Sequence, residues 1–77
     1  MITGTQIRGA RRLLEWEPRD LAKRAKVKIT TLQRAEASDG EPAITIAHRD
    51  AIQSALEAAG VEFIPENGGE PGVRLKA

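Results

Sequence analysis

The sequence contains no cysteine, and its only histidine is His48. The missing thiols exclude disulfide bonds, a cysteine nucleophile and cysteine-ligated zinc or iron–sulfur centres. A single histidine disfavours a histidine-based metal site or a catalytic dyad, and no nucleophile–base pair is visible along the chain. We therefore expect neither an enzyme nor a protein that holds a cofactor.

Long apolar runs are also missing. The N-terminal segment, residues 1–8, has no run that could serve as a signal peptide, and no stretch approaches the ~20 apolar residues that a membrane span needs. These features predict a cytoplasmic protein with no membrane partner. With 77 residues and 40% apolar content, the chain has room for one small domain. Domains this short often gain stability by dimerising.

Charge is divided unevenly along the chain. The whole sequence has 12 Lys and Arg against 11 Asp and Glu, a formal net charge of +1. Residues 1–34 carry nine basic and three acidic side chains, a net of +6, and residues 35–77 carry three basic and eight acidic ones, a net of −5. Such an asymmetry predicts a surface on one side that faces a polyanion.

The first segment has the pattern of an amphipathic helix. Apolar residues recur at helical spacing at Ile7, Ala10 and Leu14. This stripe predicts a helix from about Thr5 to Glu15. Thr3 and Gln6 have the spacing of a capping box, in which each side chain binds the other's backbone amide.

Three further helices are predicted from residues that favour helix starts or ends and from the spacing of apolar residues. Pro18 is favourable in a first helical turn, where its missing N–H is not needed, and predicts a short helix over 18–25. A third helix is predicted over 29–37. Thr45 caps a fourth, and Gly60 follows that helix where a left-handed residue commonly ends one.

The C-terminal segment has strand composition. Val61–Ile64 and Val73–Leu75 are rich in β-favouring residues, and the Gly- and Pro-rich loop at 65–72 permits a hairpin without requiring one. We expect a mainly α fold with a bundle of about four helices over residues 1–60. Residues 61–77 form a strand or hairpin tail that could serve dimerisation.

Residues 8–36 resemble the lambda-repressor-like helix-turn-helix transcriptional regulators, of the Cro and xenobiotic-response-element (Xre) type. The matching string is Arg11-x-x-Leu14-x-Trp16-x-x-x-Asp20-Leu21-Ala22, followed by Ala25-x-Val27-x-x-x-Thr31-Leu32-x-Arg34-x-Glu36. It covers just over a third of the chain, and the tail also resembles the ending of short bacterial members. The resemblance implies a helix-turn-helix bundle that binds double-stranded DNA and regulates transcription.

In helix-turn-helix docking, the N-terminal part of the second helix of the motif meets base edges in the major groove. The residues expected to contact bases are Lys28, Ile29, Thr30, Gln33 and Arg34. Arginine can bind guanine bidentately, glutamine can read adenine, and isoleucine can pack on a thymine methyl group. The residues expected to contact phosphates are Arg19, Lys23 and Lys26. Phosphate contacts supply affinity and register but carry no sequence information.

Four other features have a structural interpretation. The resemblance implies that Arg11 and Glu36 pair between the first and third helices. Trp16 is expected in the core rather than on a base, because tryptophan is mostly buried. We expect His48 to be a surface or half-buried helical residue, and the Gly68–Gly69 segment to be a turn, since it lacks the ending of a phosphate-binding loop.

The chain departs from the family pattern at three places. Lys26 stands where the corner normally has Gly, and Lys28 where the next helix normally has a Ser or Thr cap. Glu17–Pro18 replaces the Ser/Thr-Gln that opens the second helix, which removes a phosphate-gripping side chain and adds a repelling charge. The two lysines add positive charge that partly offsets this loss.

The leading hypothesis is a homodimeric regulator on a two-fold operator, because half-sites about 34 Å apart require a symmetric pair. The acidic C-terminal half is the candidate dimer surface, through strand pairing or through packing of Phe63 and Ile64. The alternative is an antitoxin-like or protein-interaction module that keeps the fold and binds a protein partner, a toxin or another regulator. Glu17, Pro18 and the acidic second half favour this alternative.

Overall fold

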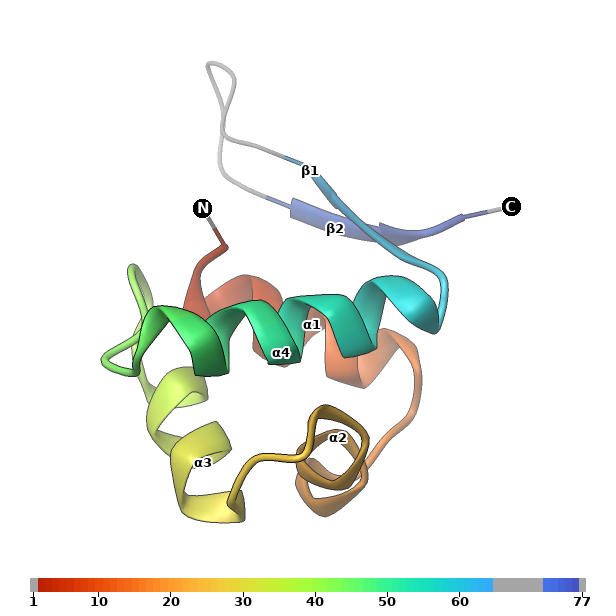
Figure 1. The fold of residues 1–77 in the computed structure, drawn as a ribbon. Helices are drawn as coiled ribbons and strands as arrows, with labels where there is room; N and C mark the ends of the chain where they lie inside the picture. Colours follow the sequence, from red (N-terminus) through yellow and green to blue (C-terminus); the bar gives the residue numbers. More distant parts are fainter. Residues whose placement is uncertain (1, 65–71, 77) are drawn as a thin grey trace.

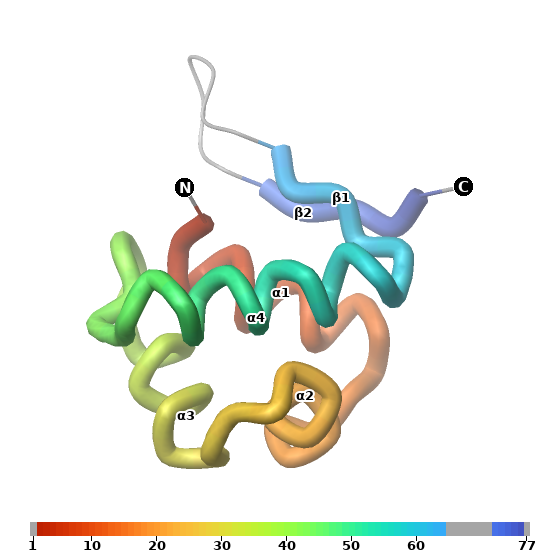
Figure 2. Tube along the Cα trace, viewed as in Figure 1, coloured from red at the N-terminus to blue at the C-terminus, as the bar shows by residue number. Residues whose placement is uncertain are grey.

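The computed structural model describes residues 2–64 and 72–76. Within these ranges the chain forms four helices and two strands: α1 (Gly4–Leu13), α2 (Pro18–Ala25), α3 (Ile29–Ala37), α4 (Ile46–Ala58), β1 (Val61–Ile64) and β2 (Gly72–Leu75). Figure 1 shows the helices packed together, with the two strands lying across the side of α1 and the end of α4. The same path is visible in the tube of Figure 2. The expected mainly α architecture is confirmed.

The N-terminus of α1 has the expected capping box. The Gln6 amide donates to Thr3 Oγ1 at 3.1 Å, and the Thr3 amide donates to Gln6 Oε1 at 2.8 Å. The helix ends at Leu13, two residues before the predicted end, because Glu15 has a left-handed backbone with φ of 57°. A residue in that conformation cannot continue a right-handed helix.

The predicted bounds of α2 and α3 agree with the structure. Pro18 occupies the first position of α2, and the Glu17 amide ahead of it donates to Asp20 Oδ2 at 2.9 Å. At the other end Lys26 is left-handed, with φ of 58°, and the Val27 amide donates to the Ala22 carbonyl at 3.0 Å. This is the hydrogen bonding of a Schellman motif, which ends α2 and turns the chain into α3.

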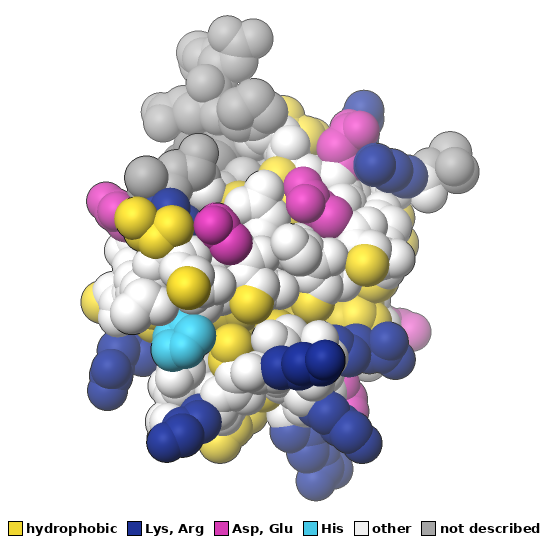
Figure 3. Space-filling view, viewed as in Figure 1, with side chains coloured by type: hydrophobic (Ala, Val, Ile, Leu, Met, Phe, Trp, Pro, Cys, Tyr) yellow, Lys and Arg dark blue, Asp and Glu magenta, His cyan; other side chains and the backbone are white. Residues whose placement is uncertain are grey.

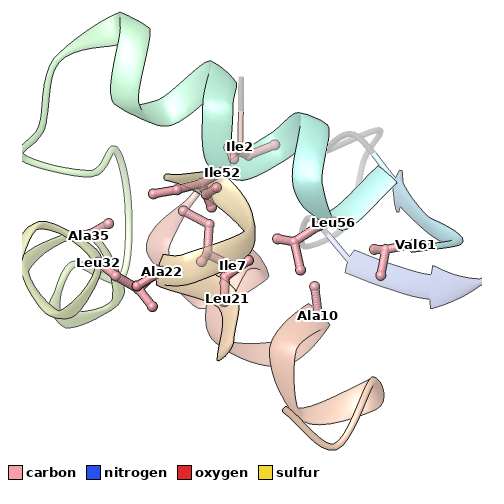
Figure 4. Close-up of a cluster of buried hydrophobic side chains, with 11 residues drawn as sticks. Ile2, Ile7, Ala10, Leu21, Ala22, Leu32, Ala35, Ile52, Leu56 and Val61 are labelled. Atoms are coloured by element: carbon pink, nitrogen blue, oxygen red, sulfur yellow. The ribbon is translucent and has the colours of Figure 1, made fainter. Parts of the chain in front are cut away.

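One hydrophobic core joins the helices and the hairpin. Its fully buried side chains come from all four helices and from β1, and the largest are Ile7, Leu21, Leu32, Ile52, Leu56 and Val61. Figure 4 shows these side chains converging between the elements. Trp16 and Val27 pack against the cluster from its edge and are partly exposed. Trp16 therefore belongs to the core only in part.

The two strands form the antiparallel hairpin that the composition permits. Val61 pairs with Leu75 and Phe63 pairs with Val73. Gln6, which is 3% exposed, attaches this hairpin to α1, because its Nε2 donates to the carbonyls of Ile64 at 3.2 Å and Gly72 at 3.0 Å. The expected turn at Gly68–Gly69 lies outside the described residues.

The start of α1 lies against the end of α3 at very short range. A Cβ atom added to Gly4 would overlap the carbonyl oxygens of Ser38 and Ala35. The Gly4 amide donates to the Gly40 carbonyl at 2.9 Å, so the loop after α3 also satisfies the first amide of α1. Only glycine permits this approach, which fixes the position of α3 relative to α1. None of the described helices has the length and apolarity needed to cross a membrane.

Candidate nucleic-acid interface

Helix α3 has one buried side and one exposed side. Leu32, Ala35 and Glu36 face inward, and the remaining residues are exposed or half-buried. The residues predicted to contact bases are all exposed: Lys28, Ile29, Thr30, Gln33 and Arg34. Successive helical residues are rotated by about 100°, so Thr30 and Arg34 lie opposite the buried Leu32. The side of α3 that meets solvent is therefore polar and basic.

The predicted phosphate-contacting residues flank this side of α3. Leu21, Ala22 and Ala25 bury the inner face of α2, which leaves Arg19 and Lys23 exposed. Lys26 is exposed at the corner between the helices. We refer to the following residues together as the basic surface: Arg19, Lys23, Lys26, Lys28, Ile29, Thr30, Gln33 and Arg34. These eight residues lie on α2, at the corner and on α3, and all of them are exposed.

Charge is separated in space as well as in sequence. In Figure 3 most of the visible Lys and Arg side chains lie over α2 and α3, and most of the visible Asp and Glu side chains lie over α4, the loop before it and the hairpin. The separation follows from the fold, because the basic front of the chain builds α2 and α3 and the acidic back builds α4 and the strands. A polyanion that meets the α2–α3 end encounters few like charges.

The pair that the resemblance implied between Arg11 and Glu36 is present. Arg11 Nε donates to Glu36 Oε2 at 2.8 Å, and Nη2 donates to Oε1 at 2.9 Å. The two side chains are 13% and 10% exposed. The hydrogen bond with Glu36 raises the pKa of Arg11, against the opposing effect of burial. Nη1 of the same guanidinium donates to the Trp16 carbonyl at 2.9 Å, so Arg11 has a structural role.

Two further basic residues, Arg8 and Arg24, make contacts within the protein that were not predicted from the sequence. Arg8 donates to the backbone carbonyl of Glu36, and its Nη2 lies 3.5 Å from Asp39 Oδ1. Arg24 lies over the Trp16 ring, with its guanidinium carbon 4.4 Å from the ring centroid. These contacts join residues from different elements, and no local pattern signals them. The stacked Arg24 covers one face of Trp16, which disfavours base stacking there.

A hollow of about 450 Å³ lies next to the basic surface, between α3 and the start of α4. It is lined by Thr31, Arg34, Ala43, Ile44, Thr45 and His48. His48 is exposed, consistent with a surface position, and Thr45 Oγ1 accepts from its backbone amide at 3.1 Å. Figure 3 shows the histidine close to the boundary between the basic end and the rest of the molecule.

The three departures from the family pattern occupy the two helix junctions. Lys26 is left-handed, as a glycine at that corner would be. Lys28 is the N-cap of α3 and its side chain makes no capping hydrogen bond. Glu17 is the N-cap of α2, and both it and Asp20 are exposed. The start of α2 and the corner between α2 and α3 therefore form with residues that stabilise these conformations less than the Ser, Thr or Gly of the family pattern would.

Residues 2–64 and 72–76 contain no group of three or more His, Cys, Asp or Glu side chains that could hold a metal ion. Comparison of the chain with profiles of known protein families, with characterised proteins and with solved structures found no match. The geometry and charge of the basic surface are therefore the observations that bear on function.

Proposed function

We propose that this chain is a sequence-specific regulator that binds double-stranded DNA through α3, as lambda-repressor-like helix-turn-helix proteins do. One observation carries the proposal: all eight residues of the basic surface are exposed on two consecutive helices and the corner between them. The buried Arg11–Glu36 pair supports it, because it holds the end of α3 against α1 and keeps the exposed side of α3 in a fixed orientation.

The size of α3 suits the major groove, which is about 12 Å wide and admits one α-helix. With α3 in the groove, Gln33 and Arg34 reach base edges and Ile29, 38% exposed, packs on a thymine methyl group. Arg19, Lys23 and Lys26 neutralise phosphates on the flanking strands. Each such contact releases a condensed counterion, so affinity falls as salt rises.

We propose a homodimer as the DNA-binding form. The described part of the chain measures 33 × 27 × 18 Å, so one copy covers one half-site and a second is needed for half-sites about 34 Å apart. Ile64 and Leu75 are 39% and 47% exposed on the hairpin. They lie at opposite ends and on opposite faces of it, because Leu75 pairs with Val61 and Ile64 pairs with Gly72. We propose Ile64, on the face turned away from Val61, as the apolar side chain at the contact. Phe63, also suggested by the sequence, is partly buried and packs against the core on one side.

The proposal is tested by selecting bound sequences from random duplexes and then measuring affinity at several salt concentrations. Lys23→Gln should weaken binding to all duplexes and reduce the salt slope by about one. Gln33→Ala should change the selected sequence at one position. Lys76→Gln is the matched control, because it removes the same charge from an exposed residue at the hairpin end.

The proposal fails if purified protein shows no duplex binding at low salt, or if Lys76→Gln weakens binding as much as Lys23→Gln does. Absence of duplex binding at low salt would favour the second candidate, an antitoxin-like or protein-interaction module. That candidate is favoured by Glu17 and Pro18 at the start of α2, where an exposed carboxylate repels phosphate.

A further inference from the structure

Asp39 and Gly40 form an Asp–Gly pair in the loop between α3 and α4. The Asp39 side chain is 93% exposed, and its ion pair with Arg8 Nη2, at 3.5 Å, leaves the carboxyl group in solvent. Gly40 is exposed as well, and a Cβ atom placed on it would meet no atom within 4 Å. Nothing nearby therefore hinders a reaction between this carboxyl group and the amide that follows it.

The Gly40 amide nitrogen is the group that can attack this carboxyl. Gly40 lies outside the helices and strands, and among residues 2–64 and 72–76 its amide donates no hydrogen bond. The other two aspartates of the chain, Asp20 and Asp50, lie inside α2 and α4. There the amide of the next residue takes part in the helical hydrogen-bond ladder. Asp39 is therefore the aspartate whose neighbouring amide can react.

The backbone carbonyls of the same two residues attach the end of α3 to the start of α1. The Asp39 carbonyl accepts from Thr5 Oγ1 at 3.1 Å, and the Gly40 carbonyl accepts from the Gly4 amide at 2.9 Å. Figure 1 shows this loop beside the start of the chain. The Gly4 amide belongs to the first turn of α1, whose amides have no partner within the helix. Both contacts require the ordinary main-chain length between the two carbonyls.

We propose that Asp39–Gly40 is a site of spontaneous isoaspartate formation, and that the product detaches the end of α3 from the start of α1. In the first step the Gly40 nitrogen forms a bond to Asp39 Cγ, and a water molecule leaves with a carboxyl oxygen and the amide proton, which gives a cyclic succinimide. In the second step water reopens the ring. Addition at Cγ restores aspartate, and addition at the Asp39 backbone carbonyl gives isoaspartate, whose main chain runs through Cβ and Cγ.

The product changes the loop without changing its charge, because one carboxylate is lost and another is gained. The main chain between Asp39 Cα and the Gly40 nitrogen becomes one carbon atom longer, and the Asp39 backbone carbonyl becomes a carboxylate on a side branch. The Ser38 carbonyl oxygen is already packed against Gly4, so the added length cannot be taken up towards α1. The Gly40 carbonyl is therefore displaced from the Gly4 amide, and that hydrogen bond is lost.

The test incubates the purified, folded chain at neutral pH and maps it by tryptic digestion at intervals. Cleavage after Arg34 and Arg49 releases residues 35–49, which contain Asp39–Gly40. Asn67–Gly68, which can form the same product and lies outside the described residues, is released separately within residues 50–74. Fragmentation that distinguishes isoaspartate from aspartate should show isoaspartate accumulating in residues 35–49. A second unfolding transition should appear roughly 5 °C below that of the unmodified chain, the shift expected for the loss of one backbone hydrogen bond.

Gly40→Ala is the matched control. Its methyl group hinders the approach of the amide to the carboxyl, and the fold accepts it, because φ at Gly40 is not left-handed and the added Cβ meets no atom. This variant keeps Asn67–Gly68 and should retain its melting temperature on incubation. Asp39→Asn should form the succinimide faster, since an uncharged amide accepts a nucleophile more readily than a carboxylate does. Treating the incubated wild-type chain with an isoaspartyl methyltransferase and S-adenosylmethionine should restore the original unfolding transition.

Each alternative result is decisive. Isoaspartate confined to residues 50–74 would show that the folded loop protects Asp39, and would reject the inference. Isoaspartate within residues 35–49 without a second unfolding transition would reject the detachment of α3. An equal loss of melting temperature in Gly40→Ala would assign the loss to another site. None of these measurements uses DNA, so the inference and the proposed function succeed or fail separately.

Discussion

Glu36 receives two hydrogen bonds from Arg11, so the last turn of α3 is attached to the last turn of α1 by a nearly buried ion pair. Removing one partner of such a pair leaves the other charge buried and destabilises a protein by about 3 kcal/mol. We expect Glu36→Gln to lower the free energy of unfolding by about that amount, and duplex affinity to fall with it. Thermal unfolding and DNA binding measured on the same preparation check this.

A matched control for Glu36 is Glu41→Gln. Glu41 Oε1 lies 3.8 Å from Arg49 Nη1, and the Glu41 side chain is 71% exposed. Neutralising this carboxylate should therefore change the free energy of unfolding by well under about 1 kcal/mol. Loss of DNA binding by Glu36→Gln without any loss of melting temperature would contradict the structural assignment. The raised pKa of Arg11 keeps its guanidinium charged. The contribution of the Arg11–Glu36 pair to the free energy of unfolding is therefore full at neutral pH and is lost only in strongly alkaline solution.

Gly4→Ala should destabilise the protein although alanine is the better helix former. The new methyl group would overlap backbone oxygens of Ala35 and Ser38, which cannot move without separating α1 from α3. We expect a loss of roughly 2 kcal/mol or more in chemical unfolding. Gly40→Ala is the control, because a Cβ there meets no atom within 4 Å. Equal effects of the two substitutions would contradict the close approach.

Lys26→Gly should stabilise the protein while weakening duplex binding. A left-handed conformation at φ of 58° disfavours a residue with a side chain by about 1 kcal/mol, and glycine removes that strain together with the charge. Lys26→Ala removes the charge and keeps the strain. The two variants should therefore lose DNA affinity equally, with only the glycine variant melting at a higher temperature. A lower melting temperature for Lys26→Gly would refute this account of the corner.

Gln6→Leu should release the hairpin from α1. It removes the donor that both Ile64 and Gly72 carbonyls share, which should lower the free energy of unfolding by about 2 kcal/mol. Hydrogen exchange should speed up first in β1 and β2. Gln53→Leu, which removes an exposed contact to Glu57, should leave exchange of the hairpin unchanged. Faster exchange confined to α4 in the Gln6 variant would show that the attachment has been misread.

Much of this fold is predictable because its signals are local. Pro18, the Thr3–Gln6 capping box and the Thr45 cap each act within one helical turn, and they place α2 and the starts of α1 and α4 correctly. Exposure of Thr30 and Arg34 follows from the apolar stripe, since residues opposite the buried Leu32 on α3 must face solvent.

Features that join distant parts of the chain could not be predicted from the sequence. The attachment of Gln6 to the hairpin spans 58 and 66 residues, and the capping box explains Gln6 equally well without it. The left-handed Glu15 that ends α1 has no glycine to signal it. The hollow at Arg34 and His48 likewise depends on how α4 packs against α3, which no pattern within either helix encodes.

The separation of basic and acidic side chains between the two ends of the molecule gives this small protein an electric dipole moment despite its net charge of +1. A dipole experiences a torque in the field of any polyanion, so the α2–α3 end turns towards it before contact is made. Orientation during diffusional approach raises the fraction of encounters that are productive. A nearly neutral chain can thereby associate with a polyanion at a rate that falls as ionic strength rises.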